Sequence, residues 1–188
     1  MRLLLHTFLC VVALATVSCN RQQSNVVASN VSVQASPTQQ TVESLISSLS
    51  SPDDSTRSAD ELINIGRQSA AQREVVIHRL LKAAESQDDL RTGKCFILKN
   101  VDYWDGVTKV FAQLKATEAI DLLITTVACG NGYSGSLGRE PSMFALIDLG
   151  RVAVPKLSKA LKSERDEYVR LHLRQCLDMI KWYERHPQ

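Results

Sequence analysis

The 188-residue sequence predicts an all-helical folded region preceded by a segment of different composition. Two observations support this prediction. From Thr41 onward apolar residues recur with the 3.6-residue period of amphipathic helices. No alternating strand pattern of useful length interrupts that period, although Cys95–Leu98 is ambiguous between a helical turn and a strand. A composition of 44% hydrophobic and 22% charged residues is typical of a globular chain.

The first three helices are predicted from apolar spacing and cap residues. A helix from Thr41 carries one apolar stripe at i, i+3, i+4 and i+7, formed by Val42, Leu45, Ile46 and Leu49. Ser51 is predicted to cap a second helix, with Pro52 at its first position, and Gly66 to end it. A third helix is predicted over 69–85, with its inward residues at Val76, Leu80, Leu81 and Ala84.

The same pattern returns in the C-terminal part. A helix with Met143 to Leu149 ends at Gly150, and the next contains Val154, Leu157 and Leu161. The sequence at 163–166, Ser-Glu-Arg-Asp, resembles a capping box with Asp in the last place. It precedes a final helix whose apolar face is predicted to contain Val169, Leu173, Cys176, Leu177 and Ile180.

These helices form an internal repeat. Asp53 stands four residues before Arg57 at the start of a second helix, and Asp166 stands four residues before Arg170 in the same context. The stretch around Arg91 is a weaker copy. The spacing resembles the HEAT-repeat family, especially its short bacterial members, over roughly residues 41–182. The resemblance implies a short right-handed α-solenoid of about four antiparallel helix pairs, near 41–66, 69–115, 117–150 and 152–182. Stacking lets such pairs share a continuous core.

The two middle units are predicted to carry inserted loops. About 15 residues around Thr92–Gly106 have no counterpart in the first unit, and Cys129–Glu140 separates the helices of the third unit. Long loops in compact domains are often functional. Aromatic residues in such loops favour protein interfaces. The candidate partner-binding residues are therefore Tyr103, Trp104, Asn131 and Tyr133. Alternatively, the aromatic residues cover the core beside their own loops.

The N-terminus is predicted to direct export. One cation, Arg2, precedes a short apolar run and then small residues, which is typical of a signal peptide over 1–18. Thr16-Val17-Ser18-Cys19 resembles a bacterial lipobox, except that Thr16 stands where Leu is usual; it implies lipidation of Cys19. The alternative is ordinary cleavage near Ala15 or Ser18 and a soluble periplasmic or secreted product. Residues 19–40, rich in Gln, Ser and Asn, are predicted to form a flexible tether before the repeat domain at 41–188.

The remaining cysteines and histidines are predicted to have structural roles, not roles in metal binding or catalysis. We predict a Cys95–Cys129 disulfide between the two insertions and a buried Cys176 thiol; the alternative is three buried thiols. His78 and His172 lack partners at metal spacing, so no metal or other cofactor is expected. The stretch Gly132–Ser136 lacks the final Gly and the preceding strand of a nucleophile elbow. We therefore expect no catalytic activity.

The net charge and the composition favour a protein partner over nucleic acid. A formal net charge of +2 and an aromatic content of 5% do not favour nucleic acid. The leading hypothesis is an exported, membrane-anchored lipoprotein of the cell envelope that uses a helical-repeat surface to bind an unknown protein partner. One alternative is an immunity-type protein that neutralises a toxin outside the cytoplasm. Another is an enzyme, because these repeats resemble those of lyases acting on bilin chromophores, although export argues against it.

Overall fold

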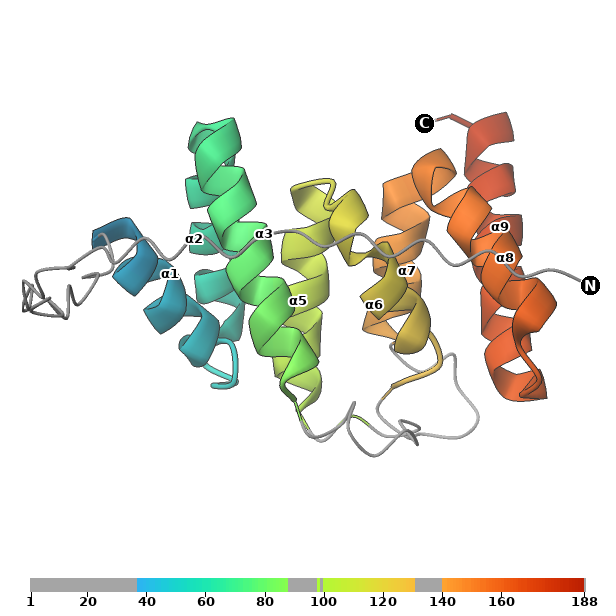
Figure 1. Ribbon diagram of the computed structural model, residues 1–188, viewed down its shortest axis with the longest axis horizontal. Coiled ribbons are helices and arrows are strands. Elements are labelled where there is room, and N and C mark those ends of the chain that lie inside the picture. Colours follow the sequence, from blue (N-terminus) through green and yellow to red (C-terminus); the bar gives the residue numbers. More distant parts are fainter. Residues whose placement is uncertain (1–36, 88–97, 99, 131–139, 188) are drawn as a thin grey trace, which may run out of the picture. The chain divides into compact units, whose positions relative to one another are not determined.

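The computed structural model describes residues 37–87, 98, 100–130 and 140–187, and these are mostly helical and contain no strands. Figure 1 shows the helices following one another in chain order. Their bounds are α1 Pro37–Ser48, α2 Ser55–Gln68, α3 Ala70–Glu85, α5 Val101–Gln113, α6 Ile120–Thr125, α7 Pro141–Leu149, α8 Val154–Ser163 and α9 Glu167–Arg185. Two short 3-10 turns, η1 Thr117–Ala119 and η2 Gly150–Ala153, lead into α6 and α8. The all-helical prediction is confirmed for the described residues.

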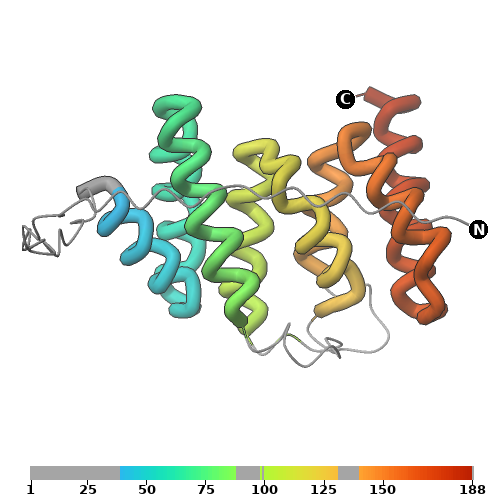
Figure 2. Tube along the Cα trace, viewed as in Figure 1, coloured from blue at the N-terminus to red at the C-terminus, as the bar shows by residue number. Residues whose placement is uncertain are grey.

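The contacts between helices form two series, which can be followed in Figure 2. In one series α2 packs against α5, α5 against α7, and α7 against α9. In the other, α1 packs against α3 and α6 against α8, while α3 contacts η1 at the start of α6. Each predicted repeat unit contains one helix from each series, in the pairs α1–α2, α3–α5, α6–α7 and α8–α9.

The core lies where the faces of these helices meet. Its largest fully buried aliphatic and aromatic side chains come from both series, and they include Leu49, Leu62, Leu80, Trp104, Phe111, Leu123, Leu146, Leu157, Leu173 and Ile180. Most of the predicted stripe residues are buried here, because a helix with a 3.6-residue apolar period places them all on one side. No described helix is long and apolar enough to cross a bilayer.

Three helix starts differ from the sequence prediction. α1 begins at Pro37, so the last residues of the predicted tether are helical; proline is favoured at a first helical position because no N–H is needed there. The segment Ser51–Asp54 is a turn, and α2 begins only at Ser55. α5 begins at Val101, which places the second part of the predicted first insertion inside a helix.

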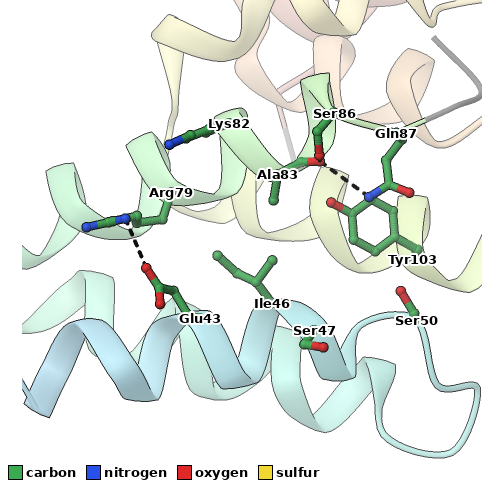
Figure 3. Close-up of a pocket in the computed structure, with 10 residues that line it drawn as sticks. All are labelled: Glu43, Ile46, Ser47, Ser50, Arg79, Lys82, Ala83, Ser86, Gln87 and Tyr103. Atoms are coloured by element: carbon green, nitrogen blue, oxygen red, sulfur yellow. Dashed lines mark hydrogen bonds and ion pairs between the residues drawn. The ribbon is translucent and has the colours of Figure 1, made fainter. Parts of the chain in front are cut away.

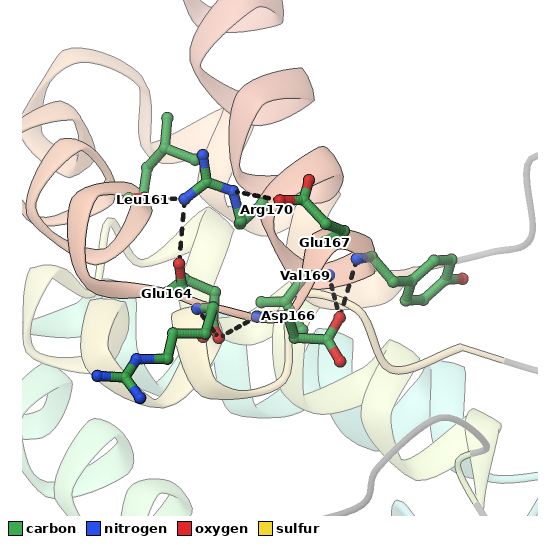
Figure 4. A network of polar contacts seen from close by, with 8 residues as sticks. Leu161, Glu164, Asp166, Glu167, Val169 and Arg170 are labelled. Atoms are coloured by element: carbon green, nitrogen blue, oxygen red, sulfur yellow. Dashed lines mark hydrogen bonds and ion pairs between the residues drawn. The ribbon is translucent and has the colours of Figure 1, made fainter.

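A network of polar contacts holds α8 and α9 together at their junction (Figure 4). Asp166 is the N-cap of α9, because its carboxylate accepts hydrogen bonds from the backbone N–H groups of Tyr168 and Val169 at 2.8 and 3.1 Å. The Arg170 guanidinium donates to the carbonyl oxygens of Leu161 and Glu164 at 3.3 and 3.0 Å. Arg57, its counterpart in the predicted repeat, pairs instead with the adjacent Asp54 and remains mostly exposed.

Candidate functional site

A pocket of about 490 Å³ lies between α1 and α3 and is the candidate functional site. We call it the α1–α3 pocket. Figure 3 shows its lining residues. Its apolar part comes from Ile46 on α1 and Ala83 on α3, and most of its other lining residues are polar: Glu43, Ser47, Ser50, Arg79, Lys82, Ser86, Gln87 and Tyr103. Apolar surface beside a few convergent polar groups is typical of binding sites.

Tyr103 is positioned at this pocket by the first turn of α5. Asn100 is the N-cap of that helix: its side-chain oxygen accepts the Tyr103 backbone N–H at 3.0 Å. The amide nitrogen of Asn100 donates to the Ser50 carbonyl at 3.2 Å and so ties the same turn to the end of α1. Together these bonds hold the Tyr103 backbone next to the α1 terminus. The ring edge packs against Trp104, with centroids 5.8 Å apart and planes at 84°.

The Tyr103 hydroxyl is buried without a well-formed hydrogen bond. The side chain is only 2% exposed, and its oxygen has no hydrogen-bond partner of good geometry among the described residues. Burial raises the pKa of Tyr103 to about 12, while the neighbouring Gln87 side chain acts in the opposite direction. The Gln87 amide instead donates to the Ala83 carbonyl at 3.3 Å. A buried hydroxyl without a partner costs free energy, so a group that reached this oxygen and accepted its hydrogen bond would be bound favourably.

Charged groups line the opposite part of the pocket. Arg79 on α3 forms an ion pair with Glu43 on α1 at 2.9 Å, and both side chains are partly exposed. Lys82 lies one turn further along α3 and is exposed. The two cations and one carboxylate leave one net positive charge at the pocket. Anionic groups are therefore favoured over cationic ones here.

The structure corrects the predicted placement of Tyr103 and Trp104. Both were expected in an inserted loop, but they lie in the first turn of α5 and are 2% and 1% exposed. Helix α5 approaches its neighbours closely at this point, since a Cβ atom added at Gly106 would lie 2.8 Å from a Leu49 methyl group. The burial of both rings agrees with the alternative prediction, that they cover the core. Asn131, Tyr133, Cys95 and Cys19 lie outside the described residues.

The two described cysteines differ in their bonding. Cys129 is buried and takes part in a disulfide bond. Cys176 is a free thiol on the buried face of α9, as its place in the apolar stripe predicted. Burial, together with the nearby Glu140 carboxylate, raises the pKa of Cys176 to about 12. A thiol that stays protonated at neutral pH is a poor nucleophile and a poor metal ligand.

His172 and Glu140 form a buried pair near Cys176. The Nε2 atom of His172 lies 2.6 Å from the Glu140 carboxylate, and its Nδ1 atom lies 2.8 Å from the Tyr168 carbonyl oxygen. Both ring nitrogens are therefore engaged, and neither is available to activate a nucleophile. The pair connects the start of α7 to α9, which is a structural role. Among the described residues no group of three or more His, Cys, Asp or Glu side chains is placed to hold a metal ion.

The α1–α3 pocket was not anticipated from the sequence. Its polar residues lie on two helices whose apolar stripes are easily recognised, and their remaining faces look like ordinary solvated surface. A local signal was present at the start of α5. Asn100 followed by Asp102 fits a capped helix start, and Trp104 and Val107 have the spacing of residues on one helix face. No protein-family model matches this chain, and neither a curated protein nor a solved structure matches it significantly.

Proposed function

We propose that this protein is an exported, lipid-anchored helical-repeat protein that binds a segment of another protein in the α1–α3 pocket. The pocket, with a Tyr103 hydroxyl that has no hydrogen-bond partner among the described residues, is the observation that carries this proposal. The two series of helix contacts support a HEAT-like solenoid of four antiparallel pairs, in which one series forms each side. The anchor is Cys19, and residues 19–36 supply a tether between the membrane and α1.

The chemistry of the pocket suggests an acidic, extended peptide segment as the ligand. A carbonyl or carboxylate oxygen of the segment would accept the hydrogen bond that the Tyr103 hydroxyl lacks within the described residues. Lys82 would pair with an acidic side chain of the segment. The apolar surface at Ile46 and Ala83 would receive a small aliphatic side chain. A few polar contacts of this kind fix orientation, while apolar burial contributes most of the affinity.

Photo-crosslinking in the exporting bacterium tests the pocket. A photoreactive phenylalanine analogue replaces Ser47, which lines the pocket, and crosslinked products are identified by mass spectrometry. We expect one protein partner, captured through an acidic segment, and a yield that falls about tenfold with Lys82→Glu or Tyr103→Phe. Lys159→Glu is the matched control, because it makes the same charge change at an exposed position of α8. Equal yields from all variants would contradict the proposal.

Membrane anchoring has its own test. Cys19→Ser removes the thiol to which the lipid would be attached, so the variant should move from the membrane fraction to the soluble fraction. A protein that stays on the membrane after this change is not anchored through Cys19. The partner captured by crosslinking separates the remaining alternatives, since a toxin would indicate the immunity-type function.

A further inference from the structure

The outer face of α9 carries a row of exposed apolar side chains. Tyr168, Leu171, Met179 and Trp182 are between 38% and 48% exposed, and Gln175 lies between them on the same side of the helix. The successive spacings from Tyr168 to Trp182 are three, four, four and three residues. These spacings place all five side chains along one line on a helix. We call this row the α9 stripe, and it is about 21 Å long at 1.5 Å per residue.

The position of α9 makes this row unusual. α9 packs its buried face against α7 and α8, and it is the last member of its series of contacts. The terminal unit of a stacked helical array normally presents a polar outer face, because no further unit covers it. Here the outer face has two aromatic and two aliphatic side chains in a row beside its charged residues. A row of large exposed apolar side chains on one helix face is a candidate interaction site.

The spacing of the α9 stripe is the same when it is read from either end. A second α9 running in the opposite direction therefore presents its apolar groups at matching heights. Tyr168 then lies opposite Trp182 of the second copy, and Leu171 lies opposite Met179. Gln175 lies close to the two-fold axis, where its amide can bond to its own counterpart. Self-complementarity of this kind is what a two-fold symmetric interface requires.

The charged residues along one edge of the stripe follow a closely similar symmetry, centred on residue 176 instead of 175, which is a difference of about 1.5 Å along the helix. Glu167, Arg174, Asp178 and Arg185 are all exposed, and their spacings are seven, four and seven residues. Their charges alternate from negative to positive. Reversing the helix about Gln175 therefore brings Glu167 near Arg185 and Arg174 near Asp178, with each pair offset by two residues, or about 3 Å. Glu167 is also within 3.2 Å of Arg170 on its own helix, and its side chain is 82% exposed, so it remains accessible to a second copy.

We infer that two copies of this protein associate through their α9 helices, antiparallel and centred near Gln175. The α9 stripe forms the apolar part of this interface, and the four edge charges fix its direction. Opposite charges set register and orientation, because a parallel arrangement would place like charges side by side. The interface lies on α9 and leaves the α1–α3 pocket free.

Charge exchange tests this inference. The full chain is expressed with Cys19→Ser, so that no acyl chain can join copies, and its exported product is studied by sedimentation equilibrium. We expect a dimer that Arg174→Asp or Asp178→Arg weakens about tenfold or more in Kd. The double variant Arg174→Asp/Asp178→Arg restores opposite charges across the axis and should recover dimerisation. A monomeric wild-type protein at all concentrations, or a double variant no better than the single ones, would overturn the inference.

Cysteine crosslinking tests the direction of the two helices. Leu171→Cys mixed with Met179→Cys should form a disulfide-linked dimer under mild oxidation, because these positions face each other in the antiparallel arrangement. Leu171→Cys alone should not, since its counterpart would lie about eight residues, or roughly 12 Å, away along the helix. A parallel dimer reverses this pattern and would refute the proposed geometry. Lys159→Cys, on exposed surface of α8, is the control for random collision.

Discussion

Two pairs of adjacent aromatic residues have opposite environments in this protein. Tyr103 and Trp104 begin α5, while Trp182 and Tyr183 lie near the end of α9; both pairs meet edge to face, at 84° and 81°. The first pair is 2% and 1% exposed, and the second is 45% and 42% exposed. Helix α5 lies between α2 and α7 in its series of contacts, whereas α9 is the last of its series and has a series neighbour, α7, on one side. Neighbouring helices, rather than residue type, therefore decide which aromatic pair is core and which is surface.

The largest expected difference between the two pairs is in stability. Trp104→Ala leaves a cavity in the core and should lower the free energy of unfolding by about 3–5 kcal/mol. Trp182→Ala should lower it by less than about 1 kcal/mol when measured on the monomer. Urea unfolding at low protein concentration measures both values. Equal losses would show that the two pairs do not differ in burial as described.

The disulfide at Cys129 should contribute about 2–4 kcal/mol, because a crosslink reduces the freedom of the unfolded chain. Cys129 lies shortly after the end of α6, whereas α9 carries only the free thiol of Cys176. We predict that Cys95 is the partner of Cys129. Reduction should then add about 2 Da to the intact mass. Digestion of the oxidised protein should yield a peptide linking the two residues, and a different linked peptide would refute the pairing.

His172 provides a comparison within α9 itself, because the adjacent Leu171 is exposed while His172 is buried. His172→Ala leaves the buried Glu140 carboxylate without its partner and should cost about 2–3 kcal/mol. Leu171→Ala is the matched control and should change monomer stability by about 0.5 kcal/mol or less. Thermal unfolding of the two variants measures this difference. A small effect of His172→Ala would mean that Glu140 finds another partner.

The smallest effect at neutral pH concerns the Tyr103 hydroxyl. Its pKa is raised from 10.0 to about 12 in the folded protein, so folding opposes its ionisation. The corresponding stability is fully present below pH 10 and is lost as the pH rises from 10 towards 12. Tyr103→Phe should therefore lose less stability than the wild type over that interval, and at pH 7 it should be equally or slightly more stable. Unfolding free energies measured across this range would show parallel curves if the hydroxyl were not buried.

Most of the helices could be predicted from the sequence, because each depends on spacing within one short segment. The stripes of α2, α3, α8 and α9 all contain buried residues at the positions that the 3.6-residue period indicated. The start of α5 could not be predicted by comparing repeats, since residues 101–106 have no counterpart in the first unit. The capping pattern at Asn100 would have indicated it. The α1–α3 pocket combines residues from α1, α3 and α5, and no local pattern brings these together.

The sequence alone therefore determined the helical class, the approximate positions of most helices and the buried thiol of Cys176. Each of these follows from periodicity along one segment. The tertiary structure decided which aromatic residues are buried and where the pocket and the α9 stripe lie. It also decided which groups Arg57 and Arg170 bond to. The physical reason is that burial depends on how many neighbouring helices surround a face, and chain neighbours do not reveal that number.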